Sequence, residues 1–394
     1  MDRIYLDHAG TTPVRQEVIE AMVNSMRENW GNPSSVHKEG RQARKALDEA
    51  REQVAALIGA KPEEVFFAGG GTEADNIAVQ GVALANRQKG RHLITSVIEH
   101  HAVLDAFKFL ETQGFEVTYL PVTCEGMVRV EDVAAAVRKD TVLISVMHVN
   151  NEVGTIQPIR EIGQIAIERR IFFHTDAVQS AGKIPVDVNE LNVDLLSLSS
   201  HKMYGPKGVG ALYVRKGTKM QPLIYGGGQE RKRRPGTENM PGIVGFGKAA
   251  ELARLEMPTE MPRITALRDK LIAGLIKIPG VFLNGHPTQR SPYNVNVSVK
   301  NVEGESLLLN LDLAGIAASS GSACSSGSLD PSHVLLAMGL SRELAHGSLR
   351  MTLGRDNADA DINYVLEVLQ PILEWLRSMS PLEGKEEEAC HCNN

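Results

Sequence analysis

Cysteine and tryptophan are scarce in this chain, and no long apolar run interrupts it. The 394 residues include two tryptophans and four cysteines, Cys124, Cys324, Cys390 and Cys392. So few and widely spread cysteines exclude the disulfide framework of a small secreted domain. No apolar stretch approaches the ~20 residues needed to cross a bilayer, and the N-terminus lacks the basic and then apolar order of a signal peptide. These absences predict a cytoplasmic protein with free thiols.

An excess of positive charge is also absent. Lys and Arg total 42 against 48 Asp and Glu, a net charge of −6. This balance argues against a nucleic-acid or anionic-membrane partner. Hydrophobic residues make up 42% of the chain, enough for a well-buried core. The length suggests two domains.

Short apolar segments alternate with amphipathic helical patterns through the first half of the chain. A helix is predicted to start at Thr12-Pro13, and a second to cover residues 38–58. Strands are predicted at 65–67, 92–95, 117–120, 142–147, 171–174 and 195–198. This alternation indicates an α/β fold with a mainly parallel sheet flanked by helices.

The pattern changes after the glycine run 226–228. A basic loop at 231–234 precedes helices near 241–254 and 264–276, strands at 294–299 and 349–353, and a last helix at 359–379. We expect a large domain over 1–255, a smaller α+β domain over 256–380 that carries the loop around Cys324, and a flexible tail over 381–394. The N-terminal segment of the large domain can also pack on the small domain. The tail's Cys390-His391-Cys392 supplies at most three ligands, fewer than a closed tetrahedral site needs, so no metal site is predicted.

Gly69-Gly70-Gly71-Thr72 separates a strand from a helix. Free backbone N–H groups and the helix dipole favour an anion at such a turn, and Thr72 adds a hydroxyl. A tight turn with a threonine cap explains the segment equally well.

Lys202 follows directly after the predicted strand 195–198, together with Ser199 and His201. Open α/β sheets bind ligands at the carboxyl ends of their strands. A deprotonated lysine amine there can form a Schiff base, and Ser199 and His201 can donate to a phosphate. Most lysines in such loops are simply solvated.

Asp176 ends the preceding strand and is followed by Gln179. A buried carboxylate at this place can pair with a protonated pyridine nitrogen and keep the ring an electron sink. Capping of the next helix is the common alternative. Because successive strands end at one edge of the sheet, Asp176 and Lys202 can converge on one ligand.

Three further residues carry candidate roles. His100 precedes a predicted helix and could stack on a planar cofactor and move protons, although His101 could serve instead. Asn151 could bond to a ring hydroxyl or a substrate carboxylate, or merely form a turn. Arg350 could hold a carboxylate with two parallel hydrogen bonds, or make a structural ion pair.

Cys324 lies among small residues in the stretch 319–327. Such a loop can carry a thiol between two sites, and a nucleophilic role requires its thiolate form. An exposed thiol in a linker is the alternative.

Four stretches resemble one family of enzymes: residues 31–35, 147–152, 199–205 and the loop around Cys324. Together with the residues above, they resemble the cysteine desulfurases of the NifS/IscS type, within the fold-type I, class V aminotransferase-like family. The loop around Cys324 is similar to that of the group I branch. The resemblance covers nearly the whole chain.

The resemblance implies a homodimer that binds pyridoxal 5'-phosphate in a fold-type I architecture. Lys202 would hold the cofactor as a Schiff base, and Thr237 would reach the phosphate of the partner subunit. The implied cofactor contacts are Gly71, Thr72, His100, Asn151, Asp176, Gln179, Ser199, His201, Lys202 and Thr237. In these contacts Asp176 holds the pyridine nitrogen and Gln179 the ring oxygen.

The implied reaction converts L-cysteine to L-alanine and leaves the sulfur on Cys324 as a persulfide. Lys202 removes the Cα proton and His100 moves the thiol proton. Asn151 and Arg350 bind the substrate carboxylate, with Asn32 nearby. The sulfur then passes to an acceptor protein such as an iron–sulfur scaffold.

Two residues depart from the family pattern, because His8 and Gly10 stand where Asn and Ala are expected. Three rival functions stay open: a selenocysteine lyase, an aminotransferase or other carbon-centred enzyme on the same cofactor, and a non-enzymatic cofactor-binding scaffold. The aminotransferase gives Cys324 no role.

Overall fold

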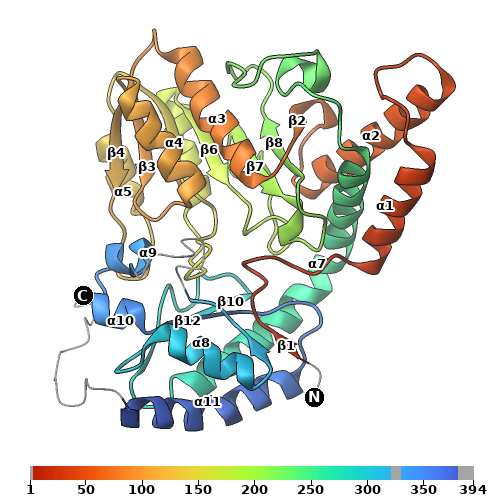
Figure 1. Cartoon of the computed structure of the whole chain (residues 1–394). Coiled ribbons are helices and arrows are strands. Elements are labelled where there is room, and N and C mark those ends of the chain that lie inside the picture. The colour runs from red at the N-terminus through yellow and green to blue at the C-terminus, as the bar shows by residue number, and fades with distance from the viewer. Residues whose placement is uncertain (1–2, 321–329, 380–394) are drawn as a thin grey trace.

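The structure, a computed structural model, describes residues 3–320 and 330–379. Within them the mixed α/β architecture is confirmed, with a mainly parallel sheet flanked by helices (Figure 1). None of the helices described in these two ranges is both long and apolar enough to cross a membrane.

A seven-stranded sheet forms the larger part of the described chain, in the order β2-β8-β7-β6-β5-β3-β4. Its strands are β2 (Val65–Ala68), β3 (His92–Ser96), β4 (Glu116–Leu120), β5 (Thr141–Ser145), β6 (Phe172–Asp176), β7 (Leu195–Ser199) and β8 (Gly210–Val214). All neighbours pair in parallel except β8, which is antiparallel to both β2 and β7. The six predicted strands are therefore present and β8 was missed. The other six strands run in one direction, so their carboxyl ends share one edge of the sheet.

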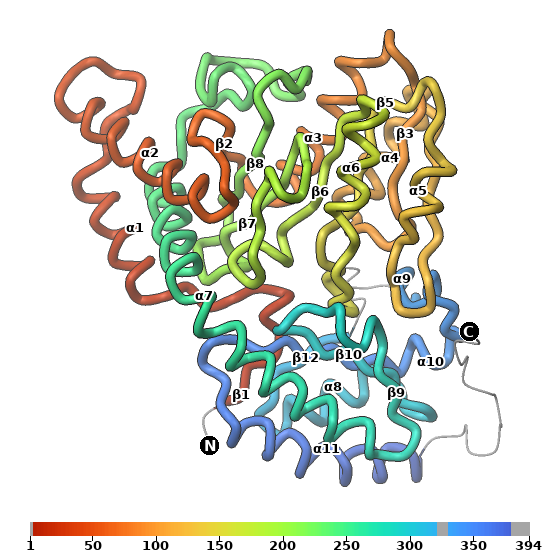
Figure 2. Tube along the Cα trace, turned by 180° about the vertical axis from the view of Figure 1, so that it is seen from behind, coloured from red at the N-terminus to blue at the C-terminus, as the bar shows by residue number. Residues whose placement is uncertain are grey.

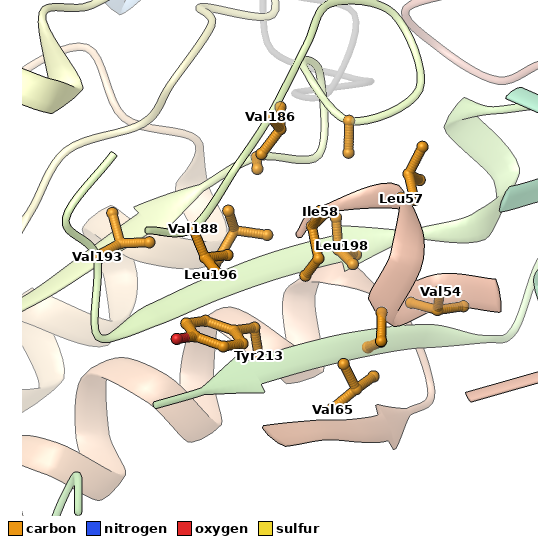
Figure 3. Close-up of a cluster of buried hydrophobic side chains, with 14 of the residues drawn as sticks. Val54, Leu57, Ile58, Val65, Val186, Val188, Val193, Leu196, Leu198 and Tyr213 are labelled. Atoms are coloured by element: carbon orange, nitrogen blue, oxygen red, sulfur yellow. The ribbon is translucent and has the colours of Figure 1, made fainter. Parts of the chain in front are cut away.

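Helices cover both faces of this sheet. They are α1 (Gln16–Glu28), α2 (Lys38–Leu57), α3 (Gly71–Asn86), α4 (His101–Thr112), α5 (Val130–Ala136), α6 (Ile159–Arg169) and α7 (Met240–Leu275), with short 3-10 turns η1 (Pro62–Glu64), η2 (Ser200–Lys202) and η3 (Gln229–Lys232). Side chains alternate between faces along each strand. Phe66 accordingly packs with α3 and α4, whereas Val65 and Phe67 pack with α2, α6 and α7. Figure 3 shows Ile58, which directly follows α2, beside Leu198 on the face of the sheet that α2, α6 and α7 cover.

A second, smaller core surrounds a three-stranded antiparallel sheet, order β12-β10-β9. Its elements are β9 (Val281–Leu283), β10 (Asn294–Val299), β11 (Ile316–Ala317), β12 (Ser348–Thr352), α8 (Gly304–Leu313) and α11 (Asp359–Met379). The short helices α9 (His333–Ala337) and α10 (Arg342–His346) contribute to a separate buried cluster with Ile98, Met147 and Val153. The N-terminal strand β1 (Ile4–Tyr5) pairs with β11, so the start of the chain joins this smaller core. Figure 2 shows α7 running from the large sheet to the smaller one.

Helix α7 differs from the two helices predicted for this stretch. It continues through Pro258 and Pro262, both of which are exposed. Each proline removes one backbone hydrogen bond, and on the exposed side water can satisfy the carbonyl that is left. The predicted domain boundary at residue 255 falls inside α7, and it stays a prediction. The predicted tail 381–394 lies outside the described residues.

The first helix also begins later than predicted. It starts at Gln16, and Thr12 does not cap it. The Thr12 hydroxyl instead donates to the His201 carbonyl (3.0 Å) and accepts from the Tyr204 N–H (2.7 Å). A tertiary contact to the Lys202 segment thus replaces the local cap.

Candidate active site

A pocket of about 300 Å³ opens where the parallel strands end. This volume is at the lower end of ordinary ligand sites. It brings together ten of the residues predicted from the sequence: Gly71, Thr72, His100, Asn151, Asp176, Gln179, Ser199, His201, Lys202 and Arg350. Nine of them come from the large sheet and its helices, and Arg350 comes from β12 of the smaller sheet. The site therefore lies between the two cores.

One end of the pocket is suited to an anion. Helix α3 begins at Gly71, and Thr72 in its first turn also lines the pocket. A Cβ on Gly71 would lie 2.8 Å from Val178 Cγ2 and 3.4 Å from Ser199 Cβ, so only glycine fits this close approach. The helix N-terminus, the Thr72 and Ser199 hydroxyls and His201 together form a set of donors for a phosphate.

Lys202 points at the backbone of the N-terminal segment. Its Nζ donates to the carbonyls of Ala9 (2.7 Å) and Gly10 (2.6 Å). The turn η2 places the lysine between β7 and the returning strand β8, whose register pairs Ser199 with Gly210. Strand β8, which was not predicted from the sequence, thus leads the chain from Lys202 back along β7.

Asp176 is buried at the end of β6 and accepts from the Val178 N–H at 2.8 Å. Burial raises the pKa of Asp176 to about 6, although that hydrogen bond and nearby Lys202 oppose the rise. Asp75 of α3 lines the same pocket and is also buried. Burial first and the charge of Asp176 second raise the pKa of Asp75. A cation placed here would relieve the repulsion between the two carboxyl groups.

His100 is the N-cap of α4, and its Nδ1 accepts from the Ala102 N–H at 3.1 Å. Burial, followed by the charge of Lys202, lowers the pKa of His100 to about 4. The ring is therefore neutral near pH 7. His100 lines the pocket, whereas His101 packs its ring 5.0 Å from that of His333. Between these two candidates, the geometry favours His100.

Arg350 makes the structural ion pair that was one of its two predicted roles, and its binding of a substrate carboxylate stays a prediction. Its Nη2 lies 3.1 Å from Asp7 Oδ1 and 3.3 Å from Ser319 Oγ, and its Nη1 donates to the Asn151 carbonyl at 3.1 Å. The side chain is only 2% exposed and lines the pocket. A structural ion pair therefore holds a guanidinium that also faces the site.

Two predicted residues do not reach the pocket within one subunit. Asn32 is exposed between α1 and α2, where its Oδ1 accepts from the Ser34 N–H at 2.9 Å. Thr237 is exposed after the basic loop. Neither belongs to the described lining of the pocket. The expectation that Asn32 lies near the substrate stays a prediction.

The cysteines give one difference from expectation. Cys124 was expected to be a free thiol but is disulfide-bonded in the structure. Cys324, Cys390 and Cys392 lie outside the described residues, so the role predicted for Cys324 stays a prediction.

The sequence patterns missed other residues of the lining, which include Ala9, Gly10, Asp75 and Met147. Asp75 lies one helical turn after Gly71, a spacing that could have revealed it. Gly10, one of the two departures, contributes its carbonyl to Lys202. The other, His8, is buried against Thr352 and Tyr5, and its Nδ1 lies 2.9 Å from the Thr352 carbonyl.

Comparison with known proteins assigns the chain to a class. Residues 4–365 match the model of the aminotransferase class-V family, a family of pyridoxal-phosphate-dependent enzymes. The chain belongs to this family.

More specific likenesses agree with the resemblance seen in the sequence. A cysteine desulfurase IscS of Methanosarcina thermophila is 58% identical over 97% of this chain and 95% of its own length. A solved NifS-like protein has a TM-score of 0.89 at 40% identity, covering 95% of this chain and 100% of its own. A structure of SspA in complex with cysteine has a TM-score of 0.80 at 41% identity, covering 89% and 98%. The resemblance to NifS/IscS-type enzymes is confirmed.

The donor set fits pyridoxal phosphate. The α3 N-terminus and the hydroxyls of Thr72 and Ser199 suit a phosphate, and buried Asp176 suits a protonated pyridine nitrogen. The Lys202 amine suits an aldehyde, and the Gly71 cradle leaves room that a Cβ would fill. Each chemical feature of the cofactor therefore has a matching group in one pocket.

Proposed function

We propose that the chain is a pyridoxal-phosphate-dependent cysteine desulfurase, converting L-cysteine to L-alanine and transferring the sulfur to Cys324. The observation that carries the proposal is the convergence of Lys202, Asp176 and Arg350 on one pocket beside an anion-binding helix end. The high identity to desulfurases over almost the whole chain supports the same reaction.

The bound cofactor supplies an electron sink, which lowers the barrier to removing a proton from the substrate Cα. Thr72, Ser199 and His201 would hold its phosphate. Asp176 would pair with the pyridine nitrogen, and a positive charge there would lower the pKa of Asp176 from its raised value.

The remaining residues act on the substrate. Arg350 and Asn151 hold the carboxylate of cysteine, which orients the Cα–H bond toward the Lys202 amine. Lys202 takes that proton as a base. His100, neutral because its pKa is lowered, accepts the proton of the substrate thiol. Its position at the pocket wall supports this role.

In the last step the sulfur passes from the substrate thiol to the thiol of Cys324. The Cys324 thiolate forms an S–S bond to the substrate sulfur, and the Cβ–S bond breaks with its electron pair going to carbon. Protonation at Cβ and return of the proton from Lys202 to Cα yield alanine, so that cysteine and one enzyme thiol become alanine and one enzyme persulfide. An acceptor protein, such as an iron–sulfur scaffold in the cytoplasm, would then take the sulfur.

We also propose that the enzyme is a homodimer. Thr237 is exposed and lies outside its own pocket, which is consistent with a contact to the phosphate in the partner subunit. Trp30 and Tyr225, at 70% and 75% exposed, supply apolar surface that a partner subunit could cover.

The decisive experiment is mass spectrometry of the purified enzyme after addition of L-cysteine. One extra sulfur on a peptide containing Cys324, with stoichiometric alanine, is expected. The Cys324→Ser variant should keep its bound cofactor and form no persulfide. Keto acid in place of alanine would indicate an aminotransferase, and cofactor binding without turnover would indicate a scaffold. Comparing alanine formed from cysteine and from selenocysteine tests the lyase alternative.

A further inference from the structure

Lys183 is a buried lysine behind the pocket wall. Only 6% of its surface is exposed, and its Nζ donates to Gln179 Oε1 at 2.8 Å. Among the described residues, no ion pair joins Lys183 to a carboxylate. Burying an ammonium group without an opposite charge is costly. Within the described part of the chain, the polar contact of Nζ is this hydrogen bond to Gln179.

The contact decides which way the amide of Gln179 faces. In its protonated form Lys183 can only donate, and the geometry shows this arrangement, with the amide oxygen of Gln179 turned toward Nζ. The two ends of an amide are otherwise nearly identical in shape. Nε2 accordingly faces the other way and donates to the Ala9 carbonyl at 3.0 Å, the same carbonyl that accepts from Lys202.

One hydrogen of this amide nitrogen is left for a ligand. An amide nitrogen carries two hydrogens, and Ala9 uses one. Gln179 lines the pocket, whereas Lys183 is not part of its described lining. The polar group that Gln179 offers to a bound molecule is therefore a donor, which favours an anionic oxygen over a hydroxyl or an apolar edge.

The charges around Lys183 strengthen this preference. The titratable and charged groups that face it are Lys202, Arg350, His8 and His201. Burial first, then the charges of Lys202 and Arg350, lowers the pKa of Lys183 to about 7. Among the groups that face Lys183 in the described part of the chain none is an acid, and Lys202 and Arg350 place positive charge beside it.

We propose that Lys183 is a positioning residue for the cofactor: by holding the oxygen of Gln179, it makes the pocket present an N–H donor to the ring oxygen of pyridoxal phosphate. The inference rests on the proposed function, because it assumes that this cofactor binds with its ring oxygen at Gln179. It assigns a role to a lysine that touches neither cofactor nor substrate.

The test compares two cofactors on cofactor-free protein. Pyridoxal phosphate and its analogue lacking the ring hydroxyl are titrated into the wild type and the Lys183→Met variant, and binding is followed by absorbance. Methionine keeps the length of the side chain and removes its donor. The variant should bind pyridoxal phosphate about ten-fold more weakly, the worth of one hydrogen bond. Its affinity for the analogue should stay within about two-fold, because no ring oxygen is present to lose a contact.

A second variant covers the case in which Lys183→Met does not fold. In Gln179→Glu, the carboxylate can pair with Lys183 but offers no donor to the ring oxygen, so the preference for pyridoxal phosphate over the analogue should again fall by about ten-fold. The double variant Lys183→Met with Gln179→Met should match Gln179→Met alone, because Lys183 acts through Gln179.

The outcomes separate the two proposals. Equal losses for both compounds in Lys183→Met, or an unchanged preference in Gln179→Glu, would overturn the positioning role. Failure of the wild-type protein to bind either compound would overturn the proposed function itself.

Discussion

Arg350 and Asp7 form an ion pair with 3.1 Å between Nη2 and Oδ1, at the place where the smaller core meets the pocket. Asp7 follows β1, and Arg350 lies in β12, whose Thr352 bridges to Asp7. The contact therefore fixes a guanidinium whose remaining donors can face a substrate. Arg350 Nε is buried and has no hydrogen-bond partner in the described part of the chain.

Replacing Arg350 by lysine should raise KM for L-cysteine by roughly ten- to a hundred-fold, with a smaller effect on kcat. A lysine keeps the charge but cannot hold a carboxylate with two parallel hydrogen bonds. Steady-state kinetics with cysteine and with cysteamine, which lacks the carboxylate, measures the effect, and the preference for cysteine should collapse. An unchanged preference, with equal loss of stability in Arg350→Lys and Asp7→Asn, would leave Arg350 a purely structural residue.

Replacing His100 by phenylalanine should slow alanine formation by about a hundred-fold, the usual worth of one proton-transfer group. The phenyl ring can still stack on the cofactor, so cofactor affinity should change little. His101→Phe is the matched control. His101 packs against His333 and does not belong to the described lining of the pocket. Similar rates in the two variants would contradict the assignment to His100.

The cofactor-free protein should become more stable when Asp176 is replaced by asparagine, and the gain should grow with pH. Burial raises the folded pKa of Asp176 from 3.8 to about 6. The folded state thus binds more protons than the unfolded state between these values, and its stability falls as pH rises through this window. Asparagine removes the buried charge, so the increase in Tm should be larger at pH 8 than at pH 4.

The same substitution should weaken cofactor binding, because the pyridine nitrogen loses its carboxylate. Thermal unfolding with and without pyridoxal phosphate would give both results in one experiment. A Tm difference that does not depend on pH would show that Asp176 is ionised without cost.

Replacing Gly71 by alanine should weaken cofactor binding by at least about ten-fold, because the new Cβ would lie 2.8 Å from Val178 Cγ2. Gly70→Ala makes a close comparison. No atom lies within 4 Å of its Cβ position, and its φ of 162° is extended backbone. Equilibrium titration with pyridoxal phosphate should show a clearly smaller loss for Gly70→Ala. Equal losses would mean that backbone freedom, and not space, decides the site.

Prediction from the sequence succeeded where local pattern decides structure. The apolar runs of the sheet and the last helix, residues 359–379, agree with the structure. It failed where distant contacts decide. Thr12 looked like a helix cap, yet it bonds to the Lys202 segment. Two helices were predicted at 241–254 and 264–276, yet α7 is one continuous helix that packs against both cores.

For the site, residue type and strand ends were enough to predict Lys202, Asp176 and Gly71, because parallel strands place their carboxyl ends at one edge. The sequence by itself determined that chemistry and the order of strands and helices. Only the tertiary structure decided that Arg350 meets Asp7, that Asp75 joins the pocket, and that Lys183 turns the amide of Gln179. These relationships depend on side chains from separate elements packed together in a buried space, where the cost of an unpaired polar group sets each orientation.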